Sequence, residues 1–176
     1  MKLTFKIIVF TFLSFSTLIF AQGVTNDIKI SKKSIEKIFK NSIYQPKNKI
    51  TIPSNPWFSD NSKYNADTIQ IINSNIGVNP SICNVKNWTF YRKNSLIITT
   101  GSYCKEPPTE SSTKLTDYFD VKIYEEDNQT FLELYNQKKL DEKFVVINIQ
   151  QYNSLSYINE KKYTITLQRI EKNACR

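Results

Sequence analysis

ICNVKNWTFYRKNSLIITTGSYC, residues 82–104, holds two apolar runs between two cysteines and is the most organised stretch of the sequence. Both runs are rich in Val, Ile, Thr, Tyr, Phe and Trp, which favour strands. The polar letters RKNS between them suit a tight turn. The pattern therefore predicts a β-hairpin with strands over 86–91 and 95–100 and a two-residue turn at Lys93-Asn94.

The same hairpin predicts a disulfide between Cys83 and Cys104. If residues 93–94 make the turn, positions whose numbers add up to 187 face each other, and the two cysteines meet this condition. Facing residues of a hairpin lie within disulfide reach. We expect the bridge near the mouth of the domain and, without a Cys-x-x-Cys spacing, a structural role for it. Cys175 leaves two other pairings open.

Strand-like patterns continue on both sides of this hairpin. The segments are short, most are joined by polar turns, and no helical pattern separates them, which indicates antiparallel neighbours. A meander of about eight strands removes its exposed edges by closing into a barrel. We therefore predict an all-β domain over 67–176, with strands at 67–72, 86–91, 95–100, 117–124, 129–136, 142–149, 152–158 and 161–170.

The first 21 residues have the pattern of an export signal. Lys2 and Lys6 precede the apolar run IIVFTFLSFSTLIF, and Ala21 supplies a small residue at the expected cleavage point. The alternative is a retained membrane anchor, but the run is short for a spanning helix. The sequence predicts a signal peptide over 1–21 and a secreted or periplasmic protein, in a compartment where disulfides persist.

Residues 22–66 form a basic arm. Residues 22–50 carry seven lysines against two acidic residues, out of a net charge of +8 for the whole chain. Ile35, Ile38 and Phe39 recur at helical spacing and predict a short amphipathic helix over 31–44. We expect this helix to pack on the main domain. Attraction of the arm to an anionic membrane surface is the alternative.

A proline-rich loop is expected over residues 45–66. It contains Pro46, Pro53 and Pro56 among many Asn and Ser residues, which are typical of linkers and wrapping loops. Trp57 and Phe58 are expected to cover an edge or an open end of the barrel.

Several function classes are excluded by composition. The chain has no histidine, which removes Ser-His-Asp and Cys-His catalysis and His-based zinc sites. Only three glycines occur, so no glycine-rich phosphate loop is available. The acidic turn at Glu125–Asp127 lacks calcium-loop spacing, and no nucleic-acid reader motif is present. We expect a protein that is not an enzyme, with no cofactor, no metal and no nucleic-acid partner.

Two segments resemble exported bacterial lipocalin-like domains. The first runs from Cys83 through Trp88 and Phe90 to Cys104, and the second is KFVVINIQQYNSLSYINEKKYTITLQRI, residues 143–170. The sequence departs from the family pattern because Ile76-Gly77-Val78 has no tryptophan after its glycine. The resemblance implies an up-and-down barrel whose interior can enclose a small apolar ligand. We expect the protein to be a monomer.

A ligand in such a barrel would contact inward-facing apolar side chains. The alternative is an eight-stranded interior that side chains fill completely. We expect either a carrier of a small apolar molecule or a protein-interaction module, such as an inhibitor or envelope accessory protein, acting through loops and the basic arm. The predicted interior positions are Trp88, Phe90, Phe119, Val121, Ile147, Tyr163 and Ile165.

Overall fold

A computed structural model of the chain describes residues 25–43, 57–73, 82–104, 106–107, 109–111, 113–153 and 161–172. The predicted signal peptide and Cys175 lie outside these residues. No helix within the described ranges is long and apolar enough to cross a membrane. The elements are β1 (Thr25–Asp27), α2 (Lys32–Ser42), β2 (Trp57–Asp60), η1 (Asn61–Lys63), β3 (Thr68–Asn73), β4 (Asn84–Arg92), β5 (Ser95–Ser102), β6 (Thr109–Glu110), η2 (Leu115–Asp117), β7 (Tyr118–Glu126), β8 (Gln129–Asn136), β9 (Lys139–Asn153) and β10 (Lys161–Lys172).

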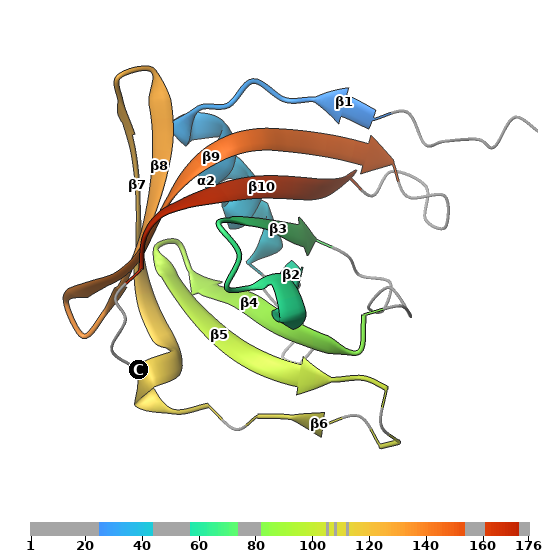
Figure 1. The fold of residues 1–176 in the computed structure, drawn as a ribbon. Helices are drawn as coiled ribbons and strands as arrows, with labels where there is room; N and C mark the ends of the chain where they lie inside the picture. Colours follow the sequence, from blue (N-terminus) through green and yellow to red (C-terminus); the bar gives the residue numbers. More distant parts are fainter. Residues whose placement is uncertain are drawn as a thin grey trace, which may run out of the picture.

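Eight antiparallel strands form a closed barrel (Figure 1). Their order is β9-β10-β3-β2-β4-β5-β7-β8, and pairing between β8 and β9 closes the ring. The short strands β1 and β6 add to β9 and β5 without entering the ring. The predicted all-β barrel of about eight antiparallel strands with one short N-terminal helix is therefore confirmed.

The barrel contains a strand that the sequence pattern did not predict. Residues Trp57–Asp60 form β2, which pairs with both β3 and β4. This strand is only four residues long. It lies within the proline-rich stretch that the sequence pattern predicts to be a loop. In a plain meander β3 would lie between β2 and β4, but here β2 lies between β3 and β4, so the order of β2 and β3 is exchanged.

Strand β9 also differs from the prediction. It runs without interruption over Lys139–Asn153, where the sequence pattern predicted a strand over 142–149 and the start of another at 152. The remainder of the predicted strand 152–158 lies outside the described residues. Gln150 and Gln151 lay between the two predicted strands, but they pair with β10 and β1 as part of one continuous strand.

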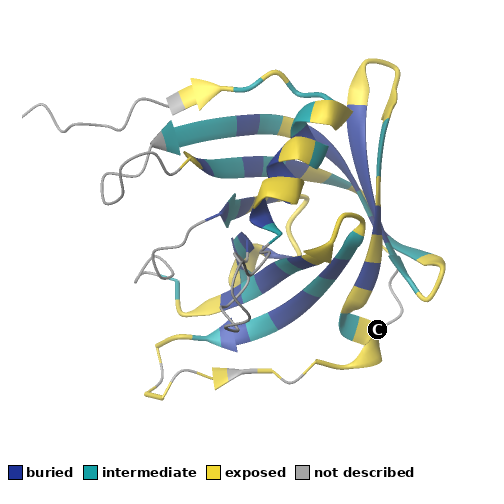
Figure 2. Ribbon diagram, turned by 180° about the vertical axis from the view of Figure 1, so that it is seen from behind, coloured by how far each residue is buried: buried dark blue, intermediate teal, exposed yellow. Residues whose placement is uncertain are grey.

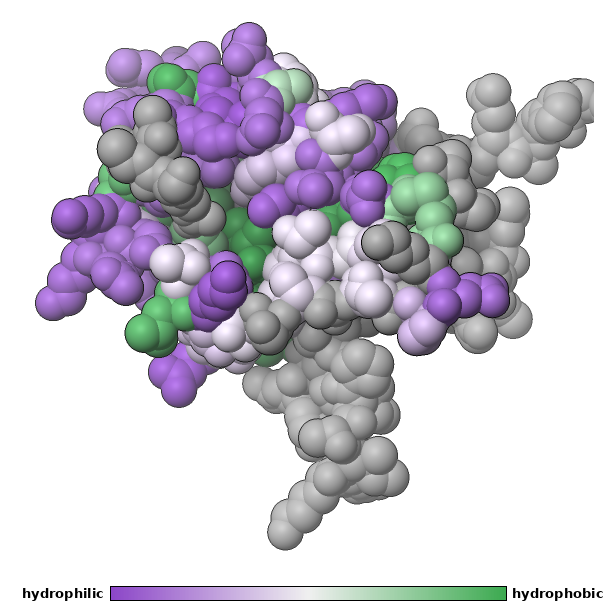
Figure 3. Space-filling model, turned by 60° about the horizontal axis from the view of Figure 1, so that its bottom comes forward, coloured by the Kyte–Doolittle hydropathy of each residue, from purple (hydrophilic) through white to green (hydrophobic). Residues whose placement is uncertain are grey.

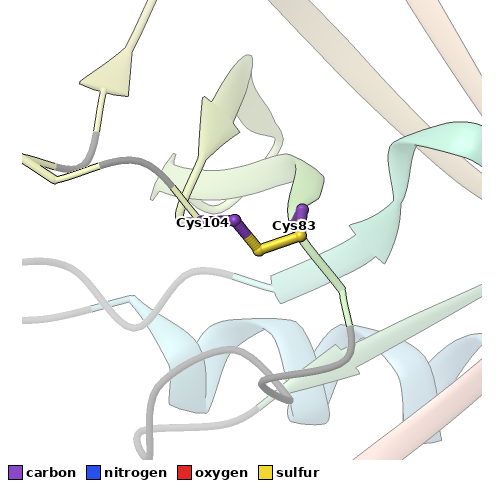
Figure 4. Close-up of a disulfide and its surroundings, with 2 residues drawn as sticks. All are labelled: Cys83 and Cys104. Atoms are coloured by element: carbon purple, nitrogen blue, oxygen red, sulfur yellow. A yellow bond between two sulfur atoms is a disulfide. The ribbon is translucent and has the colours of Figure 1, made fainter.

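The β4–β5 hairpin has a register one residue away from the predicted one. Trp88 faces Ile98, where the predicted register would pair it with Thr99. An irregularity between Phe90 and Arg92 changes the register by one residue next to the turn. Despite this shift, Cys83 and Cys104 form the predicted disulfide just beyond the strand ends, with Cα atoms 4.9 Å apart (Figure 4). Both cysteines are exposed, so the bridge lies at the surface, outside the regular ladder.

Helix α2 covers one end of the barrel. Phe39 stacks on Phe90, with ring centroids 4.3 Å apart, and meets Trp57 edge-on at 5.4 Å. Since Trp57 and Phe90 belong to the buried core cluster of the barrel, the helix reaches these side chains across an opening of the barrel. Figure 2 shows the helix lying across the near side of the barrel. The predicted packing of the helix on the main domain is confirmed.

Side-chain hydrogen bonds define the start of α2. The Ser31 hydroxyl accepts a hydrogen bond from the backbone N–H of Ser34 at 3.1 Å, which is an N-cap. The backbone N–H of Lys32 donates to the Glu125 carboxylate at 2.7 Å. A carboxylate next to a helix N-terminus is favourable. The acidic turn between β7 and β8 therefore helps to position the helix.

Arg169 occupies the region next to η1. Its guanidinium donates hydrogen bonds to the backbone oxygens of Tyr64 and Ala66, both at 2.6 Å, and pairs with Glu142 at 3.4 Å. The guanidinium carbon lies 5.4 Å from the Tyr64 ring centre and 5.2 Å from that of Phe144. These contacts bind the segment after β2 to β9 and β10.

Candidate functional site

The predicted interior positions meet in the core of the barrel, with one exception. Trp88, Phe90, Phe119, Val121 and Ile165 are buried, each at most 6% exposed. Tyr163 is partly buried and packs against the same core cluster, and burial raises the pKa of its hydroxyl. The alternating pattern of strands β4, β7 and β10 therefore identified their inward faces.

Ile147 is the exception, because it is 44% exposed. The cause is an irregularity in the β9–β10 ladder. Asn148 faces Thr166 and Val146 faces Leu167, which leaves Ile147 as an extra residue on β9. Such a bulge reverses the in-out alternation beyond it. The prediction that Ile147 faces the interior is therefore wrong.

Side chains pack tightly in the interior of the barrel. A ligand-sized cavity would leave accessible surface on the side chains around it. Trp57, Trp88, Leu134, Phe144 and Ile149 nevertheless have none. Large aromatic rings also contact each other across the interior, as Trp88 and Phe144 do at a centroid distance of 6.2 Å. The described interior therefore has the character of a packed core.

A groove of about 220 Å³ lies on the outer surface instead. We call it the tyrosine groove. It follows β7 and is bounded by the end of β4, by η2 and by the end of β8. Its lining residues are Tyr91, Leu115, Tyr118, Phe119, Asp120, Tyr135 and Gln137.

Exposed apolar surface is concentrated in this groove. Figure 3 shows that hydrophilic side chains cover much of the face turned toward the reader, with hydrophobic patches between them. Six large apolar or aromatic side chains are exposed among the described residues, and three of them line the groove: Tyr91 at 42%, Tyr118 at 38% and Leu115 at 78%. Contiguous exposed apolar surface marks interaction sites more often than scattered side chains do.

Strand pairing and hydrogen bonds fix the walls of the groove. The rings of Tyr91 and Tyr118 lie 6.1 Å apart at an interplanar angle of 77°, an edge-to-face arrangement. The Asn136 side-chain amide donates to the backbone oxygens of Thr116 at 3.0 Å and Tyr118 at 2.9 Å, which holds η2 against the end of β8. These contacts set the shape of the groove.

Tyr135 is held in the groove by a buried carboxylate on the outer face of β8. The hydroxyls of Tyr135 and Tyr124 donate to Glu133 at 2.7 and 2.8 Å. Lys122 and Lys143 lie 3.6 and 3.5 Å from the same carboxylate. Burial acts to raise the pKa of Glu133, but the two hydrogen bonds and the two positive charges outweigh it and lower that pKa. The hydrogen bond to Glu133 raises the pKa of Tyr135.

Of the groove residues, only Phe119 was among the positions predicted from the sequence. Tyr91 follows the inward-facing Phe90, and Tyr118 precedes the inward-facing Phe119. Strand alternation therefore predicts that both tyrosines face outward. A search for outward-facing aromatic residues would have found them. Their proximity, however, depends on the register in which β5 pairs with β7, and the strand pattern alone does not predict that register.

The fold and the groove define the class of protein only at the level of architecture: a closed, eight-stranded antiparallel β-barrel. Comparisons with protein-family models, with curated proteins and with solved structures found no match.

Proposed function

We propose that the protein is a non-enzymatic binding module that engages a partner protein through the tyrosine groove. One observation carries the proposal: the exposed aromatic surface lies outside the barrel, whereas the interior side chains are packed against each other. Tyrosine is enriched at protein interfaces, where it combines a large contact area with a polar end.

The geometry favours this function over transport of a small apolar molecule. A carrier needs an interior cavity, and the largest interior rings have no accessible surface. The lipocalin-like resemblance implies an up-and-down barrel, and the exchanged positions of β2 and β3 depart from that order. The resemblance therefore adds no support for a carrier.

The size of the groove suits part of a partner protein. Pockets for drug-sized ligands usually measure about 300–1,000 Å³, and the tyrosine groove has about 220 Å³. A space of this size accepts one or two side chains. The edge-to-face pair of Tyr91 and Tyr118 supplies rigid ring surface, which costs little conformational entropy on binding.

The disulfide supports a location outside the cytoplasm. A bridge between Cys83 and Cys104 indicates an oxidising compartment. Together with the export signal expected over residues 1–21, it supports a secreted or periplasmic protein. Such a protein meets its partners in the cell envelope or in the surrounding medium.

Site-specific photo-cross-linking in cells of the natural host tests the proposal. A photoreactive benzoylphenylalanine is placed at Leu115 in the groove or, as a matched control, at Ile170 on β10, which is 55% exposed. We expect a discrete cross-linked protein from position 115 only, lost when Tyr118→Ala is added. Absence of that product, together with a small molecule bound to the purified protein in native mass spectrometry, would show that the barrel is a carrier.

A further inference from the structure

We propose that the tyrosine groove selects an arginine side chain of the partner. This inference deepens the proposed function and rests on it. It follows from the charge inside the groove, from the orientation of its rings and from a cation that the chain itself already places next to one of these rings.

Asp120 is the one charged residue in the lining of the groove. It points outward from β7, because its neighbours Phe119 and Val121 face the interior, and it lies opposite Ser95 on β5 and Tyr135 on β8. Its side chain is exposed and forms no ion pair or hydrogen bond with any residue that the structure describes. A carboxylate in an aromatic groove favours a positively charged ligand.

The aromatic rings favour the same charge. The face of an aromatic ring attracts a cation within about 6 Å of its centre. The guanidinium carbon of Arg92 already lies 5.9 Å from the ring centre of Tyr91. Arg92 directly follows Tyr91 in the chain and is exposed. It therefore competes with a ligand cation for the Tyr91 ring but does not fill the groove.

Arginine fits this combination better than lysine. A guanidinium is flat, so it stacks on a tyrosine ring and at the same time donates two parallel hydrogen bonds to one carboxylate. An ammonium is a compact, strongly hydrated charge that cannot do both in the same way. Tyrosine rings and the Asp120 carboxylate line the same groove.

The test uses N-acetyl-arginine amide as the probe and N-acetyl-citrulline amide as its control, because citrulline has nearly the same flat shape but is uncharged and carries a carbonyl oxygen in place of one nitrogen. Binding is followed by NMR shifts of the tyrosine ring signals. We expect arginine to bind about two- to fivefold more tightly than citrulline, since an exposed ion pair contributes on this scale. Added salt should reduce the difference.

Three variants locate the effect. Asp120→Asn should remove the preference for arginine, whereas Glu126→Gln, at the far end of the same strand, should keep it. Arg92→Gln removes the competing cation and should bind arginine about twofold more tightly. Circular dichroism confirms that each variant is folded, as expected for exposed positions.

Equal affinity for arginine and citrulline, tighter binding of N-acetyl-lysine amide or choline, or an unchanged preference in Asp120→Asn would each overturn the inference. These outcomes differ from a failure of the proposed function. If the cross-link from position 115 persists while the arginine preference is absent, the groove binds a partner through other chemistry.

Discussion

Removing the ring of Phe39 tests whether α2 closes the barrel. The ring is 2% exposed and contacts Phe90 and Trp57, so Phe39→Ala deletes a fully buried side chain. Such truncations cost about 3–5 kcal/mol. Alanine recovers about 0.5 kcal/mol through its higher helix propensity, which places the expected loss at about 2.5–4.5 kcal/mol.

Urea unfolding followed by tryptophan fluorescence measures this loss. Lys37→Ala, at an exposed position of the same helix, is the matched control and should change the unfolding free energy by less than about 0.5 kcal/mol. Phe39→Leu retains much of the apolar volume and should fall between the two variants. If Phe39→Ala loses less than about 1 kcal/mol, the helix does not pack into the barrel opening as described.

Three further predictions concern the barrel itself. Glu133→Gln should destabilise the protein at neutral pH. Folding lowers the pKa of Glu133 below its ordinary value of 4.5. The charged Glu133 therefore stabilises the fold above pH 4.5, and this stabilisation is lost as the pH falls through the folded-state pKa. The double variant Cys83→Ser/Cys104→Ser should lose about 3 kcal/mol of unfolding free energy, measured in urea, because the disulfide closes a loop of this length. Ile147→Ala should cost less than about 1 kcal/mol, whereas Ile149→Ala should cost about 2–5 kcal/mol, measured in the same way, because only Ile149 is buried.

Each of these predictions has a control. Glu126→Gln, at an exposed carboxylate, should leave the pH dependence of unfolding unchanged. The reduced natural protein should match the double cysteine variant, and a further loss in that variant would mean that the serines act by another route. Equal costs at positions 147 and 149 would contradict the bulge in β9.

Regular alternation made much of the fold predictable. Phe119 and Val121 on β7, and Ile165 on β10, alternate with polar residues, and all three are buried. The hairpin with the disulfide was predictable because short-range spacing determines which positions can meet.

The parts that escaped prediction depend on backbone irregularities or on distant pairing. The bulge that exposes Ile147 was signalled only by two adjacent valines, Val145 and Val146, which break the alternation. Strand β2 is too short for pattern recognition and forms because β3 and β4 both pair with it. The groove required Tyr91 and Tyr118 to be brought together by strand pairing.

The position of α2 in the chain has a consequence for synthesis. The helix segment leaves the ribosome before any barrel strand, but the partners of its apolar side, such as Trp57 and Phe90, follow later in the sequence. Until they arrive, Ile35, Ile38 and Phe39 remain in contact with water. We expect the lysines around them to keep this segment hydrated and to discourage self-association of the unfinished chain.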